Sequence, residues 1–126
     1  MKKIINTIEA PKPIGPYNQA ILANGILYIS GQIAINAKSG EFVLNSVEEE
    51  TEQIMCNLGA ILEAANMTFE NVVKSSIFVT DIGEFNKINT IYGNYFKELT
   101  APARETIEVS KLPKNVHVEI SMIAQI

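Results

Sequence analysis

Runs of β-prone residues alternate along the chain with stretches of helical periodicity. Strands are indicated over residues 17–23, 26–30, 72–80, 104–110 and 116–126. Between the first two runs, Asn24-Gly25 supplies the positive φ angles of a tight turn, so these runs predict a hairpin. Residues 31–45 read as a loop, and a short extra strand is left open near residues 2–7.

Two helices are expected between these strands. Ser46, with Glu49 three residues later, forms a capping-box pattern that begins the first helix, and Asn66 suits its end. Its apolar stripe comprises Val47, Thr51, Ile54, Met55, Leu58, Ile61, Leu62 and Ala65. Asp81 and Glu84 begin the second helix. Its apolar stripe comprises Phe85, Ile88, Tyr92, Tyr95, Phe96 and Leu99.

The element order β-β-α-β-α-β-β predicts an α+β fold, with two helices packed on one face of a mixed β-sheet. Residues 1–126 contain no repeat or linker and are expected to form one domain. In residues 116–126, even-numbered apolar positions suit the helix-covered face, whereas odd-numbered positions, including His117 and Glu119, form a mixed polar face. By alternation we expect Arg104 and Thr106 on that same uncovered face. Such a face usually meets another subunit, so we expect a homo-oligomer with a site near its interface.

Composition excludes several chemistries. The 126 residues are 47% hydrophobic and 19% charged, which is typical of a folded protein rather than a disordered chain. The single cysteine, Cys56, excludes an intrachain disulfide and a Cys-rich zinc site, and the single histidine, His117, excludes a multi-histidine zinc site.

Charge and hydropathy indicate which partners and which cellular compartment to expect. A net charge of −4, with scattered lysines, argues against a nucleic-acid surface. No apolar run approaches the roughly 20 residues that span a bilayer, and the amino terminus lacks the apolar core of a secretory signal. We therefore expect a cytoplasmic protein with no membrane partner.

Arg104 is the only arginine among ten basic residues. Its planar guanidinium can bind a carboxylate or phosphate through two parallel hydrogen bonds, which lysine does not reproduce. A surface ion pair with Glu105 or Glu108 is the ordinary alternative. Because lysines supply all the other positive side chains, we favour ligand binding for Arg104.

Glu119 lies within an alternating apolar strand. Partial burial there would raise its pKa toward neutrality and allow its carboxylate to hold a water or transfer protons. An interface ion pair with a lysine of a neighbouring subunit is an equal alternative on spacing alone.

Several smaller side chains are weaker candidates. Tyr17 and Ser30 stand near the two ends of the predicted hairpin, and Ser30 precedes Gly31, where the backbone allows close approach of a ligand. Turn chemistry is the simpler interpretation of both hydroxyls, and Asn89 in the second helix is more often solvent-facing. Gly15 and Gly31 are isolated, so neither a dinucleotide fingerprint nor a P-loop is present.

Four segments, in order and at matching spacing, resemble the RidA/YjgF/UK114 family of reactive intermediate deaminases. They are Ile14-Gly15-Pro16-Tyr17, Ser30-Gly31-Gln32-Ile33 with Gly40-Glu41, Pro102-Ala103-Arg104 through Leu112-Pro113-Lys114, and Val118-Glu119-Ile120. This resemblance covers almost the whole chain. It implies a chorismate-mutase-like fold, assembled as a homotrimeric barrel with sites in the clefts between subunits.

The resemblance also implies an activity. Members hydrolyse 2-imino acids, or their enamine tautomers such as 2-aminoacrylate, to 2-oxo acids and ammonia without a metal or organic cofactor. By this resemblance Arg104 matches the arginine that binds the substrate carboxylate, and Glu119 matches the glutamate that positions the attacking water. The further matching substrate-binding positions are Tyr17, Ser30, Gly31 and Asn89.

Two positions depart from the family pattern. Many relatives have a small residue and then cysteine after the arginine, whereas this chain has Glu105 and Thr106. Thr106 still offers a hydroxyl and its backbone, so we retain it as a substrate-binding residue. Strand alternation should point Glu105 away from Arg104.

Two other functions stay open at this point. One is an endoribonuclease or translation inhibitor, a label that this family often carries, although the acidic composition gives it little electrostatic support. The other is a non-catalytic oligomer that binds a small carboxylate as a regulator or holdase, because a fold alone does not determine activity.

Overall fold

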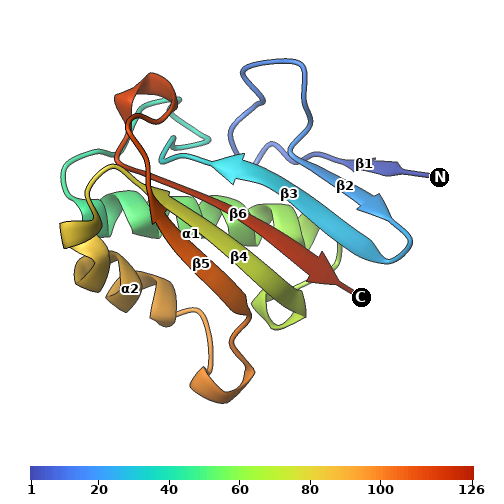
Figure 1. The fold of residues 1–126 in the computed structure, drawn as a ribbon. Coiled ribbons are helices and arrows are strands. Elements are labelled where there is room, and N and C mark those ends of the chain that lie inside the picture. The colour runs from blue at the N-terminus through green and yellow to red at the C-terminus, as the bar shows by residue number, and fades with distance from the viewer.

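Six strands form one mixed sheet in the computed structural model, which describes all 126 residues (Figure 1). The strands are β1 (Lys3–Ile5), β2 (Ala20–Ala23), β3 (Ile26–Gln32), β4 (Val72–Val79), β5 (Ala103–Glu108) and β6 (Val118–Gln125). Their spatial order is β1-β2-β3-β6-β4-β5. Every neighbouring pair is antiparallel except β4 and β5, which are parallel. The predicted α+β fold with a mixed sheet is confirmed, and the short first strand that the sequence left open is present as β1.

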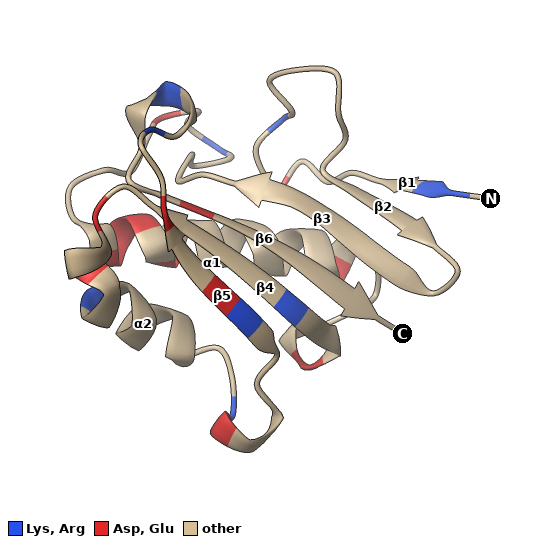
Figure 2. Ribbon diagram, in the orientation of Figure 1, with Lys and Arg blue, Asp and Glu red and all other residues tan.

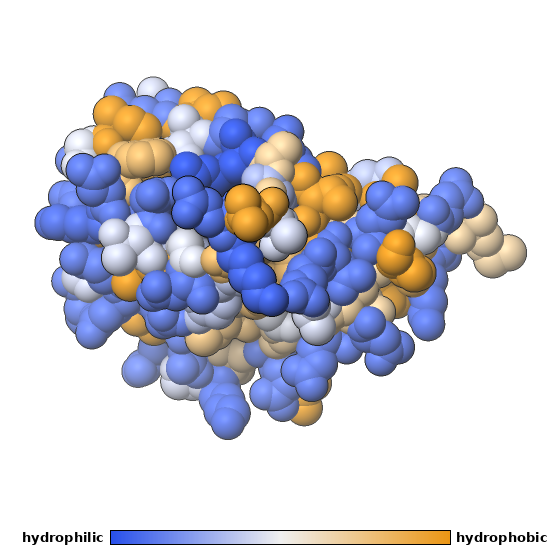
Figure 3. All heavy atoms as spheres, turned by 90° about the horizontal axis from the view of Figure 1, so that it is seen from below, coloured by the Kyte–Doolittle hydropathy of each residue, from blue (hydrophilic) through white to orange (hydrophobic).

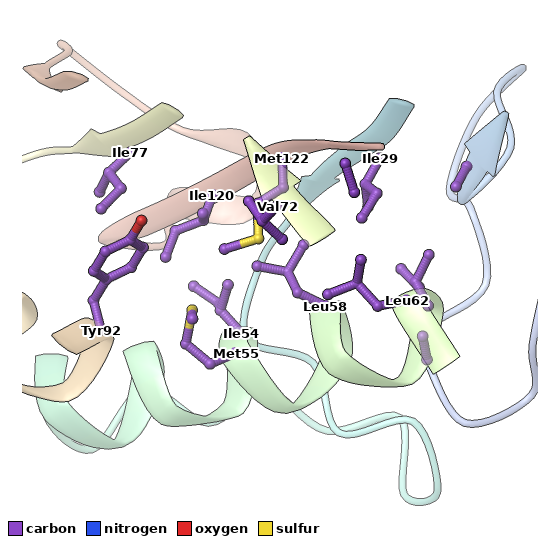
Figure 4. Close-up of a cluster of buried hydrophobic side chains, with 14 of the residues drawn as sticks. Ile29, Ile54, Met55, Leu58, Leu62, Val72, Ile77, Tyr92, Ile120 and Met122 are labelled. Carbon is purple, nitrogen blue, oxygen red and sulfur yellow. The ribbon is translucent and has the colours of Figure 1, made fainter. Parts of the chain in front are cut away.

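Two α-helices, α1 (Val47–Ala64) and α2 (Phe85–Gly93), lie on one face of this sheet (Figure 1). The core fills the space between them and the sheet: Ile54, Leu58 and Leu62 of α1 point toward Ile29, Ile120 and Met122 on the strands (Figure 4). These side chains are no more than 4% exposed. The opposite face of the sheet has no helix over it, as the chain order predicted.

Local sequence signals correctly located the turns and the first helix. Asn24 and Gly25 adopt φ angles of 53° and 77° in the β2–β3 hairpin. The Ser46 hydroxyl accepts a hydrogen bond from the Glu49 backbone N–H at 3.1 Å, and so caps α1. Beyond its end, Asn66 adopts the left-handed conformation with φ 59°.

The second helix is shorter than its apolar periodicity predicted. It ends at Gly93, a residue that weakens helices, and the following chain turns away. Tyr95 and Phe96 still reach the core because their rings contact Phe69, with centroids 5.0 Å and 5.6 Å away. Leu99, placed in the apolar stripe by the sequence, is 99% exposed.

A β-bulge interrupts the pairing of β3 with β6. Ile29 lies opposite Met122, but Gln32 lies opposite Ile120, so three steps along β3 match two steps along β6. The extra residue falls at Ser30-Gly31, where a bulge bends the strand and redirects its side chains. This position matters below because Glu119 lies beside it.

The face of the molecule seen from below is mainly hydrophilic: polar side chains cover most of it, and apolar residues form only small groups (Figure 3). Neither helix combines the length and hydropathy that a bilayer-spanning segment requires.

Candidate functional site

Arg104 lies on the helix-covered side of the sheet. In the parallel pair of β4 and β5, Arg104 is opposite Ser75 and Thr106 is opposite Ile77. Ser75 and Ile77 are buried beneath the helices. Because opposed residues share a face, Arg104 and Thr106 point toward α2. The prediction that Arg104 and Thr106 share the uncovered face with Glu119 is therefore wrong.

The position of β5 at the edge of the sheet explains this error. Its apolar residue, Ile107, lies opposite Phe78 and is 46% exposed on the uncovered face. Alternation along a central strand would have put Ile107 in the core. Here only the short helix α2 flanks the edge strand, so the inward positions of β5 can hold polar side chains.

The Arg104 guanidinium is held by α2 without an acidic partner. Its carbon lies 5.0 Å from the Tyr92 ring centroid and 5.5 Å from the Phe85 ring centroid, and Nη1 donates to the Asn89 side-chain oxygen at 2.7 Å. None of the four ion pairs in the structure involves Arg104. Most of its N–H donors therefore remain available to an anion.

A hollow of about 450 Å³ lies beside this guanidinium, lined by α2 and the chain that leads into β5. Tyr92 forms part of the wall, and its hydroxyl donates to the Ser75 hydroxyl at 2.9 Å. Burial raises the pKa of Tyr92, so this phenol stays neutral. Thr106 carries a buried hydroxyl with no hydrogen-bond partner. We call Arg104, Asn89 and Thr106 the Arg104 half-site.

Glu105 does not compete for the guanidinium. As alternation predicted, it points to the opposite face, where it accepts from Ser76 and pairs with Lys74 at 3.0 Å. The Ser76 hydrogen bond and the Lys74 ammonium hold the pKa of Glu105 below its ordinary value. Its charge is thus neutralised away from Arg104.

Glu119 lies on the uncovered face. It is opposite Phe78, between Val118 and Ile120, which are both buried beneath the helices. Its side chain rests against the backbone of Gly31, so that a Cβ atom on Gly31 would lie 2.8 Å from the carboxyl carbon. Only glycine leaves this space free. Burial raises the pKa of Glu119.

A small hollow of about 60 Å³ adjoins Glu119, Gly31 and Tyr17. A site of this size can hold a few waters, since one water occupies about 10–15 Å³ on this measure. Tyr17 is 45% exposed, and its hydroxyl accepts from the Ile14 backbone N–H at 3.3 Å. We call Glu119, Gly31 and Tyr17 the Glu119 half-site.

Ser30 lies next to this half-site but supports the hairpin. Its hydroxyl donates to the Asn18 carbonyl at 2.6 Å, and its backbone N–H donates to the Gln19 carbonyl at 2.9 Å. The structure therefore shows the turn chemistry that was the simpler interpretation of this residue.

The two half-sites are separated within one chain. β4 lies between β5 and β6, so two strand spacings of about 4.8 Å separate them, and Arg104 and Glu119 point to opposite faces. The sequence thus identified two groups of residues that one chain does not bring together.

His117 is not on the uncovered face, where the alternation put it. It precedes β6, and its Nδ1 lies 2.8 Å from a carboxylate oxygen of Glu50 on α1. Sequence reasoning also missed Glu50 and Gln19, which are 0% and 2% exposed. Glu50 had a signal: it follows Val47 by three and precedes Ile54 by four, which puts it on the apolar face of α1.

Lysine and arginine residues are spread over separate strands and loops rather than gathered in one patch (Figure 2). No group of three or more His, Cys, Asp or Glu side chains is arranged to hold a metal ion.

Comparison with known proteins gives consistent matches over the whole chain. Residues 7–126 match the family model described as Endoribonuclease L-PSP. A RutC family protein of Synechocystis is 50% identical over 97% of this chain and 95% of its own length. The human 2-iminobutanoate/2-iminopropanoate deaminase is 44% identical over 98% of this chain and 90% of its own length.

A solved structure with a ligand is also similar. The crystal structure of Escherichia coli TdcF with bound serine matches with a TM-score of 0.92 and 36% identity, covering 98% of both chains. Proteins of this fold and sequence thus include one named as a deaminase and one that holds a small amino acid.

Proposed function

The chain belongs to the RidA/YjgF/UK114 family, and from this membership and the two half-sites we propose that it hydrolyses 2-imino acids and their enamine tautomers. The products are 2-oxo acids and ammonia, as for a 2-iminobutanoate/2-iminopropanoate deaminase. The observation that carries the proposal is the Arg104 guanidinium, held against two aromatic rings with no acidic partner beside an open hollow.

Arg104 binds the substrate carboxylate in this proposal. A guanidinium forms two parallel hydrogen bonds with a carboxylate, which fixes both the position and the plane of a 2-imino acid. Asn89 orients the guanidinium through its 2.7 Å hydrogen bond. The imine carbon is already electrophilic, so orientation and one water supply most of what the reaction needs.

Glu119 positions and deprotonates the attacking water. The water oxygen bonds to the imine carbon, the C=N π electrons move to nitrogen, and Glu119 accepts the proton that the water loses. Glu119 returns this proton to nitrogen, which gives a carbinolamine with a hydroxyl and an amino group on the same carbon. Glu119 then takes the hydroxyl proton and transfers it to nitrogen as the C–N bond breaks, so that the C=O bond forms and ammonia leaves. Burial, which raises the pKa of Glu119, makes its carboxylate a stronger base than an exposed glutamate.

A complete site in this proposal combines the Arg104 half-site of one chain with the Glu119 half-site of another, because one chain holds them on opposite faces. The uncovered sheet face is then the surface on which subunits meet. We infer a homotrimer with its sites in the clefts between subunits. Tyr17, Gly31 and Thr106 contribute to the walls of these clefts.

The test is a coupled assay in which a serine or threonine dehydratase generates the enamine and 2-oxo acid release is followed. The protein should accelerate this release. Arg104→Ala should remove the acceleration, by at least about 100-fold, while the oligomer keeps its size. A parent protein without effect would refute the activity, and an Arg104→Ala variant with parental rates would refute the role of Arg104.

The same preparations decide the ribonuclease alternative, which the description of the matching family model favours. Scattered lysines and a net charge of −4 provide no continuous track for a phosphate backbone. RNA cleavage that Arg104→Ala leaves unchanged would identify a contaminating nuclease, whereas RNA cleavage lost with Arg104 would support a ribonuclease that shares this site.

A further inference from the structure

Glu50, in the first turns of α1, is the one charged residue in the structure that is buried completely. Its carboxylate accepts three hydrogen bonds, each 2.8 Å long. Two come from the backbone N–H groups of His117 and Val118, and the third partner is Nδ1 of the His117 ring. A carboxylate buried without such partners would cost several kcal/mol, so these contacts are what make its burial possible.

These contacts bind the start of β6, one residue before Glu119. From the other side, the His117 carbonyl accepts from the Thr80 backbone N–H at 3.1 Å. Residues 117 and 118 are thus fixed between α1 and the chain that leaves β4. Glu119 follows directly, and its carboxyl group has no spare room against Gly31.

We propose that Glu50 is a positioning residue for the reaction: through the backbone of His117 and Val118 it fixes the first residues of β6 and so aims the Glu119 carboxylate at the water. This inference rests on the proposed function. A buried ionised group is a poor source of stability, since replacing such groups by apolar residues is often neutral or stabilising. Its value here lies in the accuracy with which it holds one strand end, because a misplacement of 1 Å can reduce a rate about 100-fold.

The ring of His117 makes this role testable. A carboxylate accepts hydrogen bonds only, so Nδ1 of His117 must carry a hydrogen toward Glu50. In Glu50→Gln, one amide oxygen can still accept from both backbone N–H groups, but the amide nitrogen is then a donor facing Nδ1. Neutral imidazole can accept this hydrogen bond by changing tautomer, whereas protonated imidazole cannot. Two other acidic side chains, Asp81 and Glu84, line the hollow beside His117.

The experiment measures kcat and KM of the intact oligomer between pH 6 and 9, with dehydratase in excess at each pH. In Glu50→Gln we expect kcat to fall relative to the parent, modestly at pH 9 and by about tenfold at pH 6. KM should stay within about twofold, because the Arg104 half-site is untouched. In the double variant Glu50→Gln/His117→Ala, kcat relative to the parent should not decrease further between pH 9 and pH 6, because no protonated imidazole remains to face the amide N–H group. Glu49→Gln, an exposed carboxylate in the same turn, should follow the parental profile.

A folded Glu50→Gln variant whose profile parallels the parent would overturn the inference, and so would a double variant that keeps the acid-side fall. If Glu50→Gln does not fold, nitrogen-15 NMR of the parent decides: at high pH the neutral His117 ring should be the Nδ1–H tautomer, and the Nε2–H tautomer would overturn the inference. A parent that hydrolyses no imine would refute the proposed function itself, whereas an active parent with an unaffected Glu50→Gln would refute only the role of Glu50.

Discussion

The Glu119 carboxylate is the base of the proposed reaction, although its partial burial disfavours the charged form. Burial raises its pKa, so it takes up a proton at a higher pH than an ordinary glutamate, whose pKa is about 4.3. The base form should therefore disappear early on acidification. We expect kcat to fall toward acid with an apparent pKa above 4.3, and Glu119→Gln to lose about 10²–10⁴ in kcat. Steady-state kinetics in the coupled assay measure both.

The stability of the protein should depend on Glu119 with the opposite pH dependence to kcat: the contribution of Glu119 to stability is most favourable at acid pH. Because its folded pKa exceeds its unfolded pKa, its most favourable contribution is present below about pH 4.3 and is lost as pH rises through the folded pKa. Removing the charge should thus raise the Tm of Glu119→Gln above that of the parent at pH 8 and leave little difference near pH 4. A lower Tm at pH 8 would contradict the burial argument.

Gly31 provides a second test at the residue scale. In Gly31→Ala the new Cβ would lie 2.8 Å from the Glu119 carboxyl carbon and 3.1 Å from its Cγ. The end of a side chain can move aside, so the fold should survive with a small change in Tm, but Glu119 would be displaced and kcat should fall about 100-fold. Gly59→Ala, whose Cβ would lie 3.2 Å from the Phe69 ring, is the matched control and should keep parental kcat. Equal kinetics for the two variants would contradict this account.

At the element scale, the segment of residues 7–14 depends on one buried side chain. Gln19 Nε2 donates to the carbonyls of Thr7, Ala10 and Pro11 at 3.0, 3.2 and 2.9 Å, and its oxygen accepts from the Thr7 N–H at 2.7 Å. Residues 11–14 of this segment line the hollow beside Glu119. Gln19→Met should lower stability by about 1–3 kcal/mol and reduce kcat, because buried carbonyls lose their donors.

The measurement is Tm at a fixed protein concentration, together with kcat, because the stability of an oligomer depends on concentration. Asn86→Met, which removes an exposed side-chain amide from α2, provides the control and should leave both quantities near their parental values. If Gln19→Met keeps both the parental Tm and the parental kcat, this segment is held by other contacts.

Most elements could be predicted because their signals are local. Asn24-Gly25 specifies a hairpin turn, and Ser46 specifies a helix start, whatever lies elsewhere in the chain. The end of α2 was missed because aromatic contacts of Tyr95 and Phe96 preserve an apolar stripe beyond the last helical turn. Pairing with distant strands, as in the parallel β4–β5 edge, leaves no such local signal.

The same distinction applies to the candidate site. Arg104 and Glu119 could be selected from one sequence because their chemistry is unusual in their surroundings. The relative position of Arg104 and Glu119 could not be predicted, because the face that Arg104 occupies depends on which strand lies beside β5 and how far α2 extends. Glu50 was overlooked because a glutamate near a helix start usually faces water.

At the scale of the whole molecule, the opposite orientation of Arg104 and Glu119 predicts complementation between inactive variants. In an assembly with shared sites, Arg104→Ala chains still supply Glu119, and Glu119→Gln chains still supply Arg104. If the two are refolded together in equal amounts, each site has a one-half chance of an intact arginine and, independently, of an intact glutamate. About one quarter of the parental activity should return, although each variant alone is inactive.

The control is a second mixture, of Arg104→Ala with the double variant Arg104→Ala/Glu119→Gln. This mixture contains no intact Arg104 and should stay inactive. Differently tagged chains, purified through both tags, ensure that only mixed assemblies are assayed. In a mixed trimer one of the three sites combines an intact arginine with an intact glutamate, so the expected recovery rises from one quarter to about one third. If the first mixture shows no more activity than its separate components, both groups act within one chain. Because β4 and the plane of the sheet separate the two half-sites, β5 would then have to move for Arg104 and Glu119 to meet in one chain. Recovery near one third in the purified mixed trimers would instead mean that the folded chain is half of an active site, and that assembly is the step that makes it an enzyme.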